Sequence, residues 1–142
     1  MSVEPEDNTV ELTTVGDEWE RCKPWLQAAV ERDGGHYDID DVLMEVLTGE
    51  ATFWPGRACA AITQFWSFPK CKALNYWLAG GDMRELVDEM LPFVEQWGRL
   101  QGCTKIIISG REGWGRVLKP LGYRMAWVSH SKDLDMHEAG RC

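Results

Sequence analysis

Three glycines lie within six residues, at positions 110, 113 and 115, directly after the apolar run of residues 104–109. A strand, a glycine turn and a helix start can together bind phosphate, because the first N–H groups of a helix lack partners within it and the helix dipole favours an anion. The spacing G-x-x-G-x-G matches neither the dinucleotide-binding pattern nor the loop of nucleoside triphosphatases. We therefore interpret this stretch as a tight turn before a short helix, with a phosphate role as the alternative.

The side chains that bind metals or form disulfides are few and widely spaced. The cysteines stand at positions 22, 59, 71, 103 and 142 without a C-x-x-C pair, and the histidines at 36, 130 and 137 have no ligand spacing. We expect reduced thiols and no metal site.

The charge balance separates classes of partner. The chain of 142 residues has a formal net charge of −8, which repels polyanions and disfavours general nucleic-acid binding. One stretch is locally positive, and it indicates either a solvated helix face or a docking patch for an anionic ligand or an acidic partner. Its cations are Arg111, Arg116, Lys119 and Arg124.

The hydrophobic pattern predicts one α/β (α+β) domain with a mixed sheet. We expect a flexible acidic N-terminus over residues 1–9, a domain over 10–137 and a tail over 138–142. The acidic start is no signal peptide and no apolar run is long enough to span a membrane, so we expect a cytoplasmic protein. The expected order begins with a strand over 9–15, helices over 17–33 and 39–48, and strands over 51–55, 58–68 and 72–80. A helix over 82–101, a strand over 104–110, a helix over 112–119 and a final strand or hairpin over 123–134 follow.

This order of elements resembles the GNAT acetyltransferase superfamily. A local signature supports the resemblance: the last short helix ends in Leu121, Gly122 and Tyr123, where the family has a leucine, a glycine and an aromatic residue. The resemblance implies a mainly antiparallel central sheet with helices on both faces, and acetyl-CoA as the cofactor of an active member. Small phage-encoded proteins of this kind share the "GR-x-GW" and "GGD" stretches, so the resemblance extends to them.

The resemblance also implies where the cofactor would lie. In the family, backbone N–H groups hold the CoA diphosphate in a loop after the last strand of the meander, and that strand pairs with the pantetheine arm. Here the loop is shortened to Gly80 and Gly81, and a D-x-x-E spacing of Asp82 and Glu85 predicts a capping box at the N–H groups that a diphosphate needs. If acetyl-CoA binds, the residues that hold it are Leu78, Ala79, Gly80 and Gly81.

The acid and base of an acetyl transfer are not evident in the sequence. The family commonly uses a tyrosine in the penultimate helix as the general acid, and the alignment puts Leu118 there. The neighbouring strands carry no carboxylate that would act as a base. Glu112, Tyr76 and Tyr123 are weak substitutes, and we expect no catalytic residue.

Eight tryptophans in 142 residues are several times ordinary usage. Those on helical stripes are expected in the core, whereas Trp54, beside a Pro-Gly turn, and Trp66, near a strand end, are expected at a partner surface. Arg111, Arg116 and Lys119 complete that predicted surface.

Two functions follow from these features. The first is a GNAT-fold protein with a degenerate acetyl-CoA site, without the cofactor, acting mainly by binding a protein partner as a phage virion component or accessory factor. The alternative is an active, divergent acetyl-CoA-dependent N-acetyltransferase. We expect a protein partner and no membrane, in the host cytoplasm or a virion, and self-association stays open.

Overall fold

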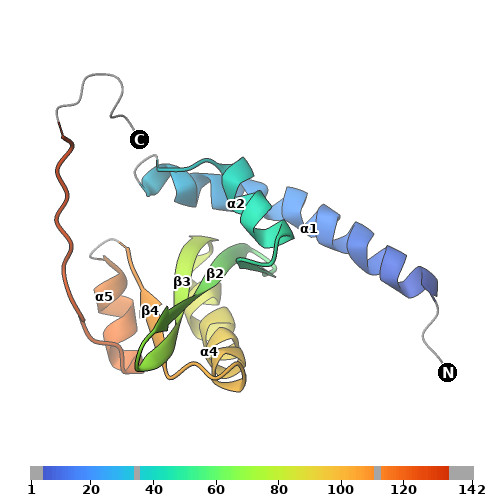
Figure 1. Cartoon of the computed structure of the whole chain (residues 1–142). Coiled ribbons are helices and arrows are strands. Elements are labelled where there is room, and N and C mark those ends of the chain that lie inside the picture. Colours follow the sequence, from blue (N-terminus) through green and yellow to red (C-terminus); the bar gives the residue numbers. More distant parts are fainter. Residues whose placement is uncertain (1–4, 34–35, 111–112, 135–142) are drawn as a thin grey trace.

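The computed structural model describes residues 5–33, 36–110 and 113–134, with side chains from residue 16 onward. Its centre is a four-stranded sheet in the order β1-β2-β3-β4 (Figure 1). The first three strands form an antiparallel meander, and β4 pairs parallel to β3. The strands are β1 (Thr52–Pro55), β2 (Cys59–Phe68), β3 (Cys71–Gly81) and β4 (Lys105–Ile108).

Helices cover both faces of the sheet, so the predicted α/β (α+β) class with a mixed, mainly antiparallel sheet is confirmed. One face packs against α1 (Pro5–Arg32) and α2 (Ile39–Leu47). The other packs against α3 (Met83–Glu85), the π-helical turn η1 (Leu86–Met90), α4 (Leu91–Leu100) and α5 (Gly113–Leu118), which runs into the 3-10 turn η2 (Lys119–Leu121).

The predicted strand over residues 9–15 is wrong, because these residues belong to α1. The alternation of apolar and polar residues there also fits a helical stripe: Leu12 and Val15 continue, at spacings of three and four, the series Trp19, Cys22 and Leu26. Elongation of an existing helix adds one hydrogen bond per residue without a new nucleus, so the helix prevails. The described part of the stripe is buried against the sheet.

The predicted strand or hairpin over residues 123–134 is also wrong. These residues have no regular secondary structure, and Figure 1 shows them as an extended segment beyond η2, apart from the sheet. A strand needs a neighbouring strand to bond its backbone. None of the described strands lies beside this segment.

The predicted domain boundaries stay a prediction. Helix α1 includes residues 5–9 of the expected N-terminal lead, and residues 138–142 lie outside the described residues. No helix in the described part of the chain is long and apolar enough to cross a membrane.

Candidate functional site

A cleft of about 380 Å³ lies where β3 and β4 separate. The two strands pair only from Ala73 to Tyr76 of β3, whereas β3 continues to Gly81. Beyond Tyr76 no described strand lies on this side of β3, and the end of α1 and the start of α5 close the sides. The lining residues are Ala29, Arg32, Asp33, Tyr76, Trp77, Leu78, Ala79, Ile108, Ser109, Gly110 and Trp114.

A β-bulge marks the start of the cleft. Leu78 lies opposite Ile62 and Tyr76 opposite Thr63, so Trp77 is the extra residue of β3. A bulge bends its strand and turns side chains in a new direction. It follows directly after the last residue of β3 that pairs with β4, which is where the two strands part.

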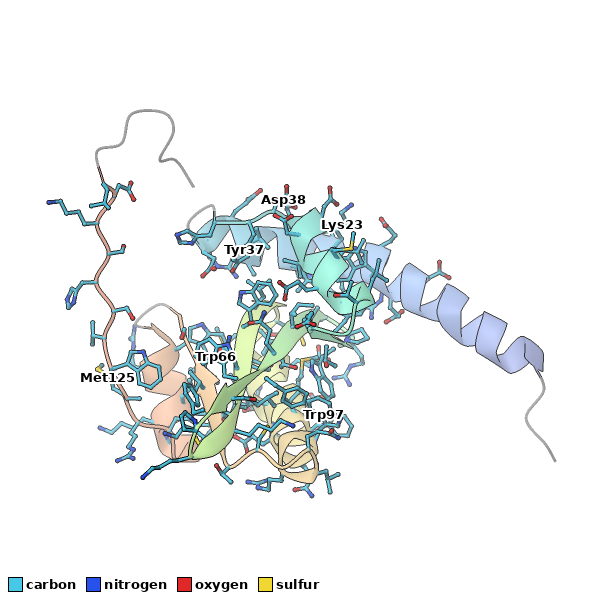
Figure 2. The ribbon with its side chains drawn as sticks, viewed as in Figure 1. Lys23, Tyr37, Asp38, Trp66, Trp97 and Met125 are labelled. Atoms are coloured by element: carbon cyan, nitrogen blue, oxygen red, sulfur yellow. The ribbon has the colours of Figure 1, made fainter. Side chains whose placement is uncertain are left out.

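A short hydrogen-bond chain holds the wall formed by the end of α1. The indole N–H of Trp77 donates to the Tyr37 hydroxyl at 2.7 Å, and that hydroxyl donates to the Asp33 carboxylate. Figure 2 shows Tyr37 between the end of α1 and the sheet. Among the described residues that line the cleft, Asp33 is the only carboxylate, and this bond already engages it.

Tyr76 brings a buried hydroxyl to the cleft. Its side chain is 2% exposed, and its oxygen has no hydrogen-bond partner among the described residues. Burial raises the pKa of the Tyr76 hydroxyl well above its ordinary value, so the group stays protonated at neutral pH. An unpaired buried hydroxyl costs free energy, which a ligand that accepts its hydrogen bond would recover.

The predicted cofactor residues divide into two pairs. Leu78 and Ala79 line the cleft, and an Arg32 Nη2 group donates to the Ala79 carbonyl oxygen at 3.3 Å. Because the N–H and C=O of one strand residue point to the same side, the Ala79 N–H also faces the open edge of β3. Ala79 is thus the one extended residue left for the predicted pairing with pantetheine, and Arg32 already bonds its carbonyl oxygen.

Gly80 and Gly81 remain in the sheet, opposite Ala60 and Cys59 of β2, and do not line the cleft. A Cβ atom at Gly80 would lie 2.3 Å from the carbonyl oxygen of Trp25 in α1. Gly81 has φ of +100°, and a Cβ there would lie 2.5 Å from the Ala58 carbonyl oxygen. The two glycines therefore permit close packing of backbone against backbone.

The junction after β3 uses its N–H groups internally. Asp82 caps the helix by accepting from the Arg84 N–H at 3.2 Å, while its own N–H donates to Ala58 and its carbonyl accepts from Leu86. The predicted cap by Asp82 is confirmed, but Glu85 does not complete a capping box. Three N–H groups at this junction thus have acceptors within the protein.

Glu85 instead holds the turn between β1 and β2. Its buried carboxylate accepts from the backbone N–H groups of Arg57 and Ala58, each at 2.8 Å. Burial disfavours the charge, but these two bonds and the Arg57 guanidinium outweigh it and hold the pKa of the Glu85 carboxyl below its ordinary value. Sequence reasoning missed this role because the D-x-x-E spacing fits a capping box equally well.

The two tryptophans of the predicted partner surface are half-buried. The indole N–H of Trp54 donates to Thr63 Oγ1 at 2.9 Å, and its ring packs edge-on against Trp97 of α4 with 5.0 Å between centroids. Trp66 lies outside both core clusters, edge-on to the exposed Phe68, and Figure 2 shows it at the sheet, well away from Trp97. Of the two, only Trp66 lies outside the core, where a partner could contact it.

The predicted basic patch lies on α5 and η2. Arg116 and Lys119 are exposed, and Arg111 lies outside the described residues. At the position where the family has its acid, Leu118 is 6% exposed in the apolar core. The Tyr123 hydroxyl donates to the Glu95 carboxylate, which engages one of the weak substitutes. Among the described residues no three His, Cys, Asp or Glu side chains gather to hold a metal ion.

Comparison with solved structures identifies the architecture. The model matches an acetyltransferase of Trypanosoma brucei with a TM-score of 0.53 and 13% identity, over 68% of this chain and 78% of that one. It matches glucosamine-6-phosphate N-acetyltransferase from Arabidopsis thaliana with a TM-score of 0.52 and 15% identity, over 68% and 76%. The chain has the GNAT fold.

A third solved structure, a probable acetyltransferase, matches this GNAT fold with a TM-score of 0.55 and 13% identity, over 80% of this chain and 88% of that one. No protein-family profile and no curated protein sequence matches the chain. At these identities the likeness concerns the fold alone, and the resemblance to phage-encoded proteins stays a prediction from the sequence.

Proposed function

We propose that this GNAT-fold protein has a degenerate acetyl-CoA site and acts mainly by binding a protein partner. The observation that carries the proposal is the contact of α1 with Gly80, where the Trp25 carbonyl leaves no room even for a Cβ atom. A diphosphate needs both free N–H groups and space beside them. At this junction the backbone of α1 fills the space and the Asp82 carboxylate brings a negative charge.

The residues around the cleft support the same proposal. Leu118 offers no proton, and both Asp33 and Tyr123 are engaged in hydrogen bonds with neighbouring side chains. Amine acetylation needs a proton acceptor within hydrogen-bond reach of the amine or one water away. The described lining of the cleft supplies no free carboxylate for that step.

A partner surface would lie away from the cleft. Trp66 and Phe68 form an aromatic pair on β2, and Arg116 and Lys119 are exposed cations of α5 and η2. Large aromatic and cationic side chains are the usual anchors of protein interfaces. A virion component or accessory factor of a phage is the form of this role that the sequence resemblance suggests.

The alternative is an active, divergent acetyl-CoA-dependent N-acetyltransferase, and the cleft itself favours it. Its β3 edge would hold the pantetheine arm at Ala79 once Arg32 moves aside, and the Tyr76 hydroxyl would be the proton donor nearest the separation of the strands. Bound acetyl-CoA would supply the activated acyl group. This alternative requires the junction at Gly80 to open.

Calorimetry and thermal shift with acetyl-CoA and with S-acetylpantetheine test the proposal. We expect no saturable binding of acetyl-CoA and no rise in Tm. The assay is sensitive, because a ligand present far above its Kd would stabilise the fold by several RT. Micromolar binding of acetyl-CoA with a rise in Tm would overturn the proposal. Binding of S-acetylpantetheine alone would locate the defect at the diphosphate end.

Two matched pairs of variants sharpen this test. If acetyl-CoA binds, Asp82→Ala should tighten it by removing the carboxylate nearest the diphosphate, whereas Asp88→Ala, an exposed carboxylate farther along the same helix, should have no effect. For the partner role, Trp66→Ala should weaken a partner complex at unchanged Tm. Trp54→Ala should lower Tm, because Trp54 packs against α4.

A further inference from the structure

The segment Tyr123–Leu134, which we call the arm, exposes several large apolar side chains to solvent. Four of its large apolar side chains are more than half exposed: Met125 80%, Trp127 54%, Val128 63% and Leu134 72%. Side chains of this size leave on the order of 500 Å² of apolar surface in water. Patches of a few hundred Å² on a protein surface mark interaction sites.

The start of the arm is fixed to the body and its remainder leaves it. Gly122 ends the 3-10 turn with φ of +94°, the Tyr123 N–H donates to the Leu118 carbonyl oxygen at 3.3 Å, and the Tyr123 hydroxyl donates to Glu95. From there the arm runs past the outer side of α5 rather than along the sheet (Figure 1). Met125 stands on the arm, away from the strands (Figure 2).

The sheet has a complementary open edge at β4. In the described part of the chain β4 pairs only with β3, so one side of Lys105–Ile108 has no strand beside it. An open edge presents unpaired N–H and C=O groups to another strand. The other edge strand, β1, is a poorer acceptor because it ends in Pro55, which has no N–H group to donate.

We propose that the arm of one copy of this protein adds as a strand to the β4 edge of a second copy, and that the exchange is reciprocal. The apolar stretch Met125–Val128 has four residues, the length of β4. Successive side chains of a strand point to opposite faces, and this stretch is apolar on both, as a strand between two covered faces must be.

A second copy accepts the arm more readily than its own chain does. The arm of the same chain runs away from its own β4, whereas a two-fold exchange puts both arms and both edges to use. Two arms together contribute on the order of 1,000 Å² of apolar surface, which is about the lower limit for a specific interface. The arm residues lie outside the cleft lining, so this inference does not rest on the proposed function.

Light scattering after size-exclusion chromatography, with hydrogen exchange across a dilution series of the full chain, tests the exchange. We expect a mass twice the 16.2 kDa of one chain. The amides of residues 125–128 and 105–108 should be protected together and lose protection together on dilution. A monomer at all concentrations, or a dimer whose arm amides exchange freely, would overturn the proposal, as would an arm protected in a monomer.

Variants in the arm give a second readout. Trp127→Asp and Val128→Asp should each raise the dimer dissociation constant at least about tenfold, the scale of one apolar anchor at an interface. Met44→Asp makes the same change at an exposed apolar residue of α2 and should leave the dimer intact. Equal weakening by all three variants would contradict the placement of the interface, and unchanged circular dichroism would show that each variant is folded.

Discussion

Removing the Glu85 carboxylate should destabilise the fold more than removing any exposed carboxylate on the same helix. Glu85 is 6% exposed and accepts from two backbone N–H groups of the β1–β2 turn, each at 2.8 Å. A hydrogen bond to a charged group contributes about 1.5 to 3 kcal/mol, and a buried donor left unpaired costs a similar amount. We therefore expect Glu85→Ala to lower the free energy of unfolding by about 3 to 5 kcal/mol.

The matched control is Glu89→Ala, one turn along the helix. Its carboxylate pairs with the side chain of Arg57 at 3.0 Å, but both side chains are more than half exposed. An exposed ion pair contributes about 0 to 1 kcal/mol. Urea unfolding at pH 7 measures both variants, and a loss for Glu85→Ala no larger than that for Glu89→Ala would refute the role assigned to the buried carboxylate.

The pH dependence supplies an independent check. Because the pKa of Glu85 is lowered in the folded state, its contribution is present above the unfolded pKa of about 4.3 and is lost as the pH falls through the folded pKa. Glu85→Gln keeps one acceptor oxygen but cannot ionise. The free energy of unfolding of this variant should therefore fall furthest below that of the native chain near pH 7, and the difference should shrink on acidification. A difference that is constant with pH would contradict the assignment.

Three further substitutions test separate features by the free energy of unfolding. Tyr76→Phe removes a buried hydroxyl that has no partner among the described residues and should stabilise the fold by about 1 kcal/mol; a loss instead would reveal a bound partner. Gly80→Ala should lower the free energy of unfolding by about 2 kcal/mol or more, because its Cβ would lie 2.3 Å from the Trp25 carbonyl oxygen. Gly115→Ala, whose Cβ would have no atom of the described residues within 4 Å, should stabilise by about 0.5 to 1 kcal/mol; equal effects would show that α1 moves aside without cost. Asp38→Ala removes the hydrogen bond that the Asp38 carboxylate accepts from the Asp41 N–H and should lower the free energy of unfolding by about 1 kcal/mol; no change would show that packing alone holds this helix end.

The meander and the helices that cover it could be predicted from the sequence because their signals are local. Turn residues separate the apolar runs of β1, β2 and β3, and the predicted Asp82 cap stands at the helix start where the structure has it. The buried stripe of α1 from Trp19 onward was equally clear. In each case the residues that decide the structure lie within one or two turns of each other.

The remaining features depend on distant parts of the chain. Glu85 bonds a turn 27 and 28 residues before it, so its spacing from Asp82 could not show that the carboxylate points elsewhere. The bulge at Trp77 is a one-residue offset between paired strands, which neither strand displays alone. The cleft is formed by that offset together with the end of α1, so no glycine loop in the sequence indicates it.

The contact between α1 and Gly80 also governs the rate at which any diphosphate could reach the sheet. With the Trp25 carbonyl seated on Gly80, entry requires the helix to lift from β3 and withdraw part of its buried stripe. A ligand that waits for such a motion associates at a rate set by the helix, which levels off as ligand concentration rises and increases steeply with temperature. Access of a ligand to this end of the sheet therefore depends on the position of α1 over Gly80 and not on the chemistry of a loop.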